Sequence, residues 1–167
     1  MANITEFANA FGQGVRPTLF RVEGDIGGTN LEFFVKSAQL PASNLGIIEV
    51  PYKGRKIKRP GDRTFAEWSL TVLASDNLPI RGEFESWMND LNDHKEISST
   101  TILNREWRVV AMKPDGGDHG APYTFHNVFP TEVGAVDLNY ETVDTIAEFT
   151  VTIQYDYWSG GPSNISG

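Results

Sequence analysis

Residues 147–157, Ala-Glu-Phe-Thr-Val-Thr-Ile-Gln-Tyr-Asp-Tyr, carry the pattern that decides the fold. Apolar and polar side chains alternate along this stretch, as in a β-strand with one face in a core. A second stretch from Phe65 repeats the arrangement, with Trp68, Leu70 and Val72 on its apolar side. The polar sides carry no Lys or Arg and consist of Glu67, Ser69, Thr71, Glu148, Thr150, Thr152, Gln154 and Asp156. We expect two half-buried strands, each with a smooth, weakly acidic outer face.

Most of the remaining chain alternates in the same way, in segments bounded by Gly, Pro, Asn and Asp. The expected strands cover residues 18–23, 30–37, 46–52, 55–58, 65–74, 105–113, 124–129 and 145–158. The fold class is therefore mainly β, a β-sandwich or barrel with one flanking α-helix near residues 79–92.

That helix is indicated by apolar residues at helical spacing, which are Ile80, Phe84, Trp87, Met88 and Leu91. Asp76 and Asn77 precede it as capping candidates, and Pro79 suits its first turn. The aromatic stripe predicts that the helix lies on a sheet. A weaker helical turn is expected over residues 4–11, ending at Gly12.

The composition fits one folded domain. The chain has 167 residues, of which 40% are hydrophobic and 22% charged, and this is enough apolar material for a core. No stretch has the length of a membrane helix, and residues 1–11 do not resemble a signal peptide. The absence of cysteine excludes disulfides and thiolate metal sites. We expect a single domain over residues 1–158 and a flexible C-terminal tail over residues 159–167.

The charges are unevenly distributed. The net charge is −8, which argues against general affinity for nucleic acid. The segment from Lys53 to Arg63 is nevertheless strongly basic, with six cations against the single acid Asp62, and the rest of the chain carries −13. Two copies placed head to tail would therefore be electrostatically complementary. The alternative reading of this segment is a basic hairpin that merely contacts solvent.

Little in the sequence suggests catalysis. Neither His94 nor His126 has the spacing of a metalloprotease or triad motif, and there is no phosphate-binding P-loop. The Asp- and Gly-rich segment 115–120 lacks the frame of a calcium loop and reads as a turn. The Gly-rich turn 24–30 could face a phosphate with its backbone amides, but it is also what a tight hairpin requires. We expect no catalytic residue, no metal and no cofactor.

A resemblance extends over nearly the whole chain. It rests on Arg16-Pro17-x-Leu19-Phe20, Leu40-Pro41, Tyr52-x-Gly54-Arg55-Lys56-Ile57-Lys58, Pro60-Gly61-Asp62-Arg63-Thr64-Phe65-x-x-Trp68-x-Leu70-Thr71-Val72, Phe129-Pro130-x-x-Val133-Gly134, Phe149-x-Val151-Thr152 and Asp156-Tyr157-Trp158. In this order the segments resemble the tail tube protein family of contractile-tailed bacteriophages. The segment 114–122 and the residues after Trp158 depart most from that pattern.

The resemblance implies a structural virion protein that assembles in the host cytoplasm. Six subunits would form a ring, with their strands joined into one continuous inner β-barrel, and rings stacked head to tail would form a channel for DNA. Tail sheath, baseplate or tail-tip, and tail terminator proteins would be its partners.

Two sets of residues acquire roles from this resemblance. The expected contacts between subunits or rings are Lys53, Arg55, Lys56, Lys58, Arg59 and Arg63, although Arg63 could simply fix a turn. The expected lining of the channel is Glu67, Ser69, Thr71, Glu148, Thr150, Thr152 and Asp156, where anionic and hydroxyl groups would let DNA slide. The alternatives are the tube protein of a secretion or contractile injection system, and a monomeric β-domain that binds carbohydrate or phosphate through the turn 24–30.

Overall fold

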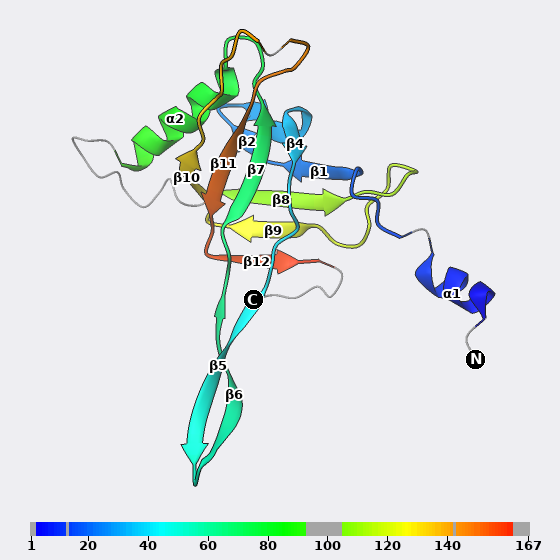
Figure 1. Ribbon diagram of the computed structural model, residues 1–167. Helices are drawn as coiled ribbons and strands as arrows, with labels where there is room; N and C mark the ends of the chain where they lie inside the picture. The colour runs from blue at the N-terminus through cyan, green and yellow to red at the C-terminus, as the bar shows by residue number, and fades with distance from the viewer. Residues whose placement is uncertain (1–2, 13, 93–104, 142, 162–167) are drawn as a thin grey trace.

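The computed structural model describes residues 3–12, 14–92, 105–141 and 143–161. Two antiparallel sheets of four strands form the body (Figure 1). The β1 sheet has the order β1 (Phe20–Glu23), β8 (Glu106–Ala111), β9 (Tyr123–His126) and β12 (Tyr157–Gly160). The β7 sheet has the order β10 (Phe129–Val133), β11 (Glu148–Gln154), β7 (Trp68–Leu73) and β4 (Val35–Ser37). The strands of the two sheets cross at a steep angle in Figure 1, as in orthogonal sheet packing.

Two strand pairs and two helices complete the structure. The short pair β2 (Asp25–Ile26) and β3 (Thr29–Asn30) precedes a 3₁₀ turn, η1 (Leu31–Phe33), and the long pair β5 (Asn44–Tyr52) and β6 (Arg55–Thr64) forms a separate hairpin. The helices are α1 (Ile4–Phe11) and α2 (Pro79–Leu91). No helix among the described residues is long and apolar enough to cross a membrane.

Aromatic side chains fill the core between the sheets and α2. Trp107 of β8 lies at the centre, with ring-centroid distances of 6.4 Å to Trp68, 6.1 Å to Phe84 and 5.7 Å to Trp87. All four side chains are buried. α2 therefore closes the core with the aromatic stripe that the sequence predicted for it.

The mainly β fold with a flanking helix is confirmed, but three of the expected strands are divided. Residues 30–37 form β3, η1 and β4, because the Asn30 side chain accepts a hydrogen bond from the Glu32 amide and starts the 3₁₀ turn. Residues 124–129 and 145–158 are divided where the chain passes from one sheet to the other. Asn127 has a φ of +56° at the first of these corners, and its side chain donates a hydrogen bond of 2.6 Å to Asp156 at the second.

The ends of some elements also differ from expectation. α2 starts at Pro79 as predicted, but its N-cap is Leu78 and no side chain caps it, so the capping role expected of Asp76 and Asn77 is wrong. β12 includes Ser159 and Gly160, which extends the folded region into the segment expected to be a tail. Residues 162–167 lie outside the described residues.

Candidate assembly interface

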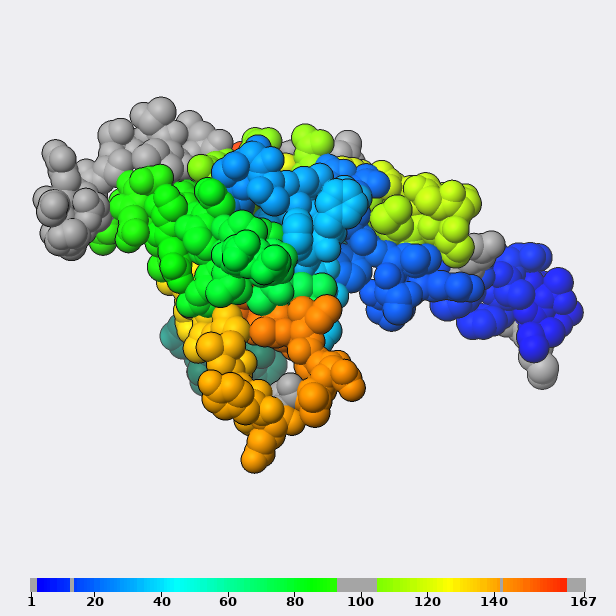
Figure 2. All heavy atoms as spheres, turned by 90° about the horizontal axis from the view of Figure 1, so that it is seen from above, coloured from blue at the N-terminus to red at the C-terminus, as the bar shows by residue number. Residues whose placement is uncertain are grey.

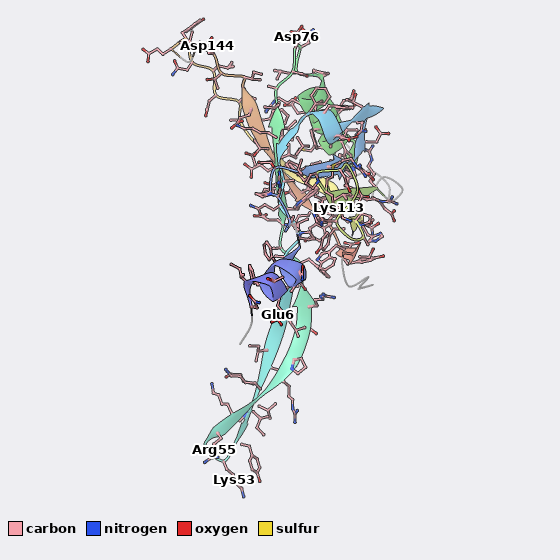
Figure 3. The ribbon with its side chains drawn as sticks, turned by 90° about the vertical axis from the view of Figure 1, so that its right-hand side faces the viewer. Glu6, Lys53, Arg55, Asp76, Lys113 and Asp144 are labelled. Carbon is pink, nitrogen blue, oxygen red and sulfur yellow. The ribbon has the colours of Figure 1, made fainter. Side chains whose placement is uncertain are left out.

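The hairpin of β5 and β6 projects from the body as a narrow two-stranded arm (Figures 1 and 3). Its tip is a two-residue turn in which Lys53 and Gly54 have φ values of +43° and +77°, as in the turns that match the twist of hairpin strands. Nearer the body, Gly46 and Gly61 face each other, since a Cβ on Gly61 would lie 3.2 Å from the Gly46 carbonyl oxygen. Nearly every side chain of the arm is exposed.

The register of the hairpin divides its side chains between two faces. Val50 pairs with Ile57, and Ile48 pairs with Arg59. This face, the apolar face of the hairpin, consists of Ile48, Val50, Tyr52, Arg55, Ile57 and Arg59. The opposite face carries the Lys56 and Lys58 side chains, and the Lys56 ammonium lies 2.7 Å from the Glu49 carboxylate.

No described residue of the monomer covers the apolar face of the hairpin. Val50 is 47% exposed, Ile57 48% and Ile48 53%, although β-branched side chains in the middle of a strand are usually packed. An exposed apolar strip of this kind marks a contact with another molecule. The basic residues of this segment were predicted from the sequence, but the apolar face of the hairpin was not. The alternation of Ile48, Val50 and Tyr52 could have indicated it.

Arg63 is separated from the other basic residues predicted to make contacts. Its guanidinium donates to the Ser43 hydroxyl at 3.0 and 3.1 Å. The same group lies 5.7 Å from the Phe65 ring centroid and 5.6 Å from that of Trp158, within cation–π range. The structure therefore places Arg63 at the base of the arm, where it ties the hairpin to the body, and places the other five cations along the arm.

The outer face of the β7 sheet is the second candidate surface. Across β7 and β11, Thr71 pairs with Thr150 and Ser69 with Thr152, and the alternate residues of both strands are buried. Four of the predicted channel residues thus lie together on one hydroxyl-rich face.

The other predicted channel residues are placed differently. Glu148 joins the same face at its edge and pairs with Lys36 of β4, a cation that the sequence reading did not include. Glu132 of β10, opposite Thr152, is an acidic neighbour that was also missed. Glu67 lies just before β7, and Asp156 lies at the corner between the sheets rather than on β11.

One cluster of side chains escaped the sequence analysis because its members are far apart in the chain. His126 Nδ1 lies 2.9 Å from a Glu106 carboxylate oxygen, and Nε2 lies 2.7 Å from the Ser159 hydroxyl. The ring also stacks on Tyr157, with centroids 4.4 Å apart. These contacts tie β8, β9 and β12 together across the β1 sheet. Spacing along the chain could not reveal them.

The turn between β2 and β3 is poorly suited to phosphate. Gly27 and Gly28 have φ values of +57° and +82°, which fits the tight-hairpin reading. A Cβ on Gly27 would collide with the Glu83 carboxylate, so an acidic group already covers the turn. The adjoining open hollow of about 590 Å³ is lined by four carboxylates and one guanidinium, those of Glu23, Asp25, Glu32, Glu106 and Arg108. An anionic ligand would be repelled there.

Comparison with known proteins decides between the remaining readings. The model of the phage tail tube protein family matches residues 3–160. The chain belongs to the phage tail tube protein family. It is 30% identical over 169 residues to tail tube protein gp19 of Enterobacteria phages T4 and T6. Each alignment covers 93% of this chain and 98% of the relative.

The fold of this tail tube protein also occurs in injection machines. It matches a chain from the extended sheath–tube complex of an extracellular contractile injection system, with a TM-score of 0.67, 15% identity, and coverage of 96% of this chain and 99% of that chain. A chain from the anti-feeding prophage baseplate matches with a TM-score of 0.70, 9% identity, and coverage of 92% and 99%. These matches show a shared fold.

Membership of this family shows that the protein is a structural component of the bacteriophage tail. The family match supports the phage reading over that of an injection-system tube, and it replaces the reading of a carbohydrate- or phosphate-binding module.

Proposed function

We propose that this tail tube protein forms six-fold rings that stack into a hollow tube through which DNA leaves the virion. The observation that carries the proposal is the exposed hairpin, whose apolar face is not covered by any described residue of the monomer. A two-stranded arm of this length has little reason to stay extended unless a neighbour covers it.

The edges of the β7 sheet support ring closure. Its outer strands are β10 and β4, and in the part of the chain that the structure describes each has a strand neighbour on one side only. Open edges invite pairing with a second chain. If β4 of one subunit pairs with β10 of the next, six four-stranded sheets close into one barrel without a free edge.

In such a barrel the hydroxyl-rich face of the β7 sheet lines the channel. The opposite face of this sheet is already packed against the core through Trp68, Leu70 and Val72. The channel face carries the ion pair of Lys36 with Glu148 and the acid Glu132, so its described residues offer no unpaired cation to hold a phosphate. DNA would be repelled weakly and evenly, which favours sliding.

Sheath, baseplate and terminator proteins are the proposed partners of the tube. The structures that share the fold include a sheath–tube complex, a baseplate and a tube terminator of injection machines. The exposed surface of α2 lies across the core from the channel face and would point outward in the tube, where such partners bind.

The direct test is electron microscopy of the purified chain, concentrated at low and at high salt, with sedimentation of the same samples. Six-fold rings or hollow tubes are the expected result, if necessary after addition of a tail-tip nucleus. A protein that stays monomeric with the nucleus present would overturn the proposal.

The channel face is tested by adding cations to it. Tubes of the Thr71→Lys, Thr150→Lys variant should retain added linear DNA in a pelleting assay at low salt, and parental tubes should not. The matched control is Ser86→Lys with Asn89→Lys on the exposed side of α2. Equal DNA retention by both variants would show that the β7 sheet does not line the channel.

A further inference from the structure

The side chains of Glu106, His126 and Ser159, which tie three strands together, also have the connectivity of a hydrolytic triad. They belong to β8, β9 and β12, which lie side by side in the β1 sheet (Figure 1). His126 Nδ1 lies 2.9 Å from a Glu106 carboxylate oxygen, and Nε2 lies 2.7 Å from the Ser159 hydroxyl. In serine hydrolases the carboxylate likewise meets Nδ1 and the nucleophile meets Nε2. The three groups therefore stand in the order that acyl transfer requires.

The hydrogen bonds decide which group gives up its proton. An ionised carboxylate can only accept, so Nδ1 of the neutral His126 ring donates to Glu106. Nε2 then carries a lone pair and accepts a hydrogen bond from the Ser159 hydroxyl. Tyr157 stacks on the imidazole, with ring centroids 4.4 Å apart, and holds its plane. The Ser159 hydroxyl thus donates to an oriented base, which is the arrangement that activates a serine nucleophile.

The three groups lie on the open face of the β1 sheet. Alternate residues of a strand point to opposite faces, and the neighbours of these groups that point into the core are Trp107, Phe125 and Trp158. The His126 side chain is 19% exposed and that of Glu106 54%, and Ser159 is half-buried. In Figure 2 the yellow-green residues of β8 and the following loop lie at the upper border, away from the orange connection between β10 and β11. A small molecule can therefore reach Ser159 without entering the proposed channel.

The backbone after Ser159 offers a donor for the negative charge that develops during acyl transfer. β12 is the last strand of the β1 sheet in the part of the chain that the structure describes. The Gly161 amide donates to the Pro122 carbonyl oxygen, so the amide before it, that of Gly160, points away from β9. The amide that follows a serine nucleophile is an oxyanion donor in other hydrolases, and the Gly160 amide is available for that role.

An open hollow of about 590 Å³ adjoins the three groups and indicates the class of substrate. Glu106 lines this hollow directly. Arg108 lines it too, and Arg108 pairs across the sheet with Thr124, which pairs in turn with Ser159. The hollow contains four carboxylates and one guanidinium. This excess of negative charge favours an ester whose alcohol group is neutral or cationic over one whose alcohol group is anionic.

We propose that Ser159, His126 and Glu106 form an acyl-transfer centre that hydrolyses small esters of neutral or cationic alcohols. Ser159 Oγ bonds to the ester carbonyl carbon while its proton passes to His126 Nε2. The bond from this carbon to the alcohol oxygen then breaks, and the alcohol leaves with the proton from Nε2. Water gives a proton to the same nitrogen and attacks the acyl-serine, and Ser159 regains the proton as the carboxylic acid leaves. Glu106 orients the imidazole and stabilises its charged form.

This activity goes beyond the proposed tube function and does not depend on it. The β1 sheet and the β7 sheet pack against the core from different sides, so the centre and the channel face are separate surfaces. Failure of tube assembly would leave the inference standing, and failure of ester hydrolysis would leave the tube standing.

Active-site labelling of the purified protein tests the nucleophile. The parent should react with a fluorophosphonate probe, and peptide mass spectrometry should locate the label on Ser159. The parent should also hydrolyse p-nitrophenyl acetate about tenfold or more faster than Ser159→Ala. His126→Phe, which keeps a ring to stack on Tyr157 but has no base, should lose both reactions. Glu106→Gln should lower both rates by about tenfold.

The matched control is Ser86→Ala on the exposed side of α2, which should react like the parent. Circular dichroism melting verifies that each variant is folded. A parent that carries no label on Ser159, or that hydrolyses the ester no faster than Ser159→Ala, would overturn the proposal.

A pair of charged esters tests the role of the hollow. Relative to spontaneous hydrolysis, the cationic 4-acetoxy-N,N,N-trimethylanilinium should be cleaved severalfold faster than the anionic 4-acetoxybenzoate. The opposite order would contradict the proposed class of substrate.

A cysteine at the position of the nucleophile tests the base separately, and the natural chain has no cysteine to confuse the result. The thiol of Ser159→Cys should react with iodoacetamide at neutral pH about tenfold faster than that of Thr124→Cys, its cross-strand neighbour. Adding His126→Phe should remove the difference. Equal rates for the two thiols would show that His126 does not activate this position and would overturn the proposal.

Discussion

Arg63 is the residue on which the direction of the hairpin depends. Its guanidinium combines two hydrogen bonds to Ser43 with stacking against Phe65 and Trp158. We predict that Arg63→Ala speeds amide hydrogen exchange over residues 44–64 severalfold while lowering the free energy of unfolding by only about 1 kcal/mol. Arg63→Lys should not restore protection, because an ammonium cannot stack its plane on the rings. Unchanged exchange in the alanine variant would contradict this role.

Tyr155 gives the stability a dependence on alkaline pH. Its ring is buried against Phe125 and Phe65, at centroid distances of 4.8 and 6.1 Å, and burial raises the pKa of its phenol above the usual value of 10.0. The folded chain therefore holds this proton more tightly than the unfolded chain. The stabilisation is complete below about pH 10 and is lost as pH rises through the raised pKa. Urea unfolding of Tyr155→Phe should show a smaller loss of stability between pH 9 and 11, and parallel curves for variant and parent would refute this.

At the scale of the element, α1 contributes no side chain to the core. None of its residues is buried, Phe7 stacks on Phe11 at 5.5 Å, and Ile4 shares their side of the helix. In Figure 1 it stands away from the body. We predict that Phe7→Ser with Phe11→Ser leaves the free energy of unfolding of the monomer within about 0.5 kcal/mol of the parent. We also predict that it weakens assembly, because we expect this exposed apolar side to pack on a second copy. Calorimetry and sedimentation measure the two effects.

The control for α1 is Asn9→Ser on its polar side, which should change neither quantity. A large loss of monomer stability in the phenylalanine variant would show that α1 belongs to the core after all.

At the scale of the whole molecule, the distribution of charge makes assembly sensitive to salt. The hairpin from Asn44 to Thr64 carries a net charge of +4, whereas the rest of the chain carries −12. Screening shortens the Debye length from about 10 Å at 0.1 M salt to about 3 Å at 1 M. We predict that the concentration needed for tube formation rises with salt across this range. Pelleting assays at several salt concentrations measure it.

The variant with Arg55, Lys56, Lys58 and Arg59 neutralised should form tubes poorly at low salt and lose most of this salt dependence. Tubes from it that are as long and as salt-resistant as those of the parent would show that the hairpin cations play no part in assembly.

Several features were predictable because their physical cause is local. The alternation over residues 147–157 predicted Phe149, Val151 and Ile153 in the core, and all three are buried. The helical spacing from Ile80 to Leu91 located α2. The basic residues from Lys53 to Arg63 indicated the position of the arm. The turn at Lys53 and Gly54 separates its two strands, β5 and β6.

The failures have a common cause in long-range contacts. Tyr157 shares the alternation of Phe149 in the sequence, yet it is 37% exposed, while Trp158 is buried. The alternation breaks because the chain changes sheets at Asp156, where Asn127, from the connection between β9 and β10, donates a hydrogen bond that fixes the corner. Likewise Lys36 meets Glu148 across 112 residues of chain, a pairing that no local pattern contains.

The sequence by itself determined the mainly β fold class, the position of α2, where the basic arm lies, and the family to which the chain is similar. Each of these depends on periodicity, turn chemistry or charge within a short window. Only the tertiary structure decided that Arg63 anchors the arm, that Asp156 lies at a corner, and that Asp144 lies at the end of the molecule opposite the tip of the arm. Those properties follow from how distant segments pack, because packing and not spacing brings their side chains together or sets them apart.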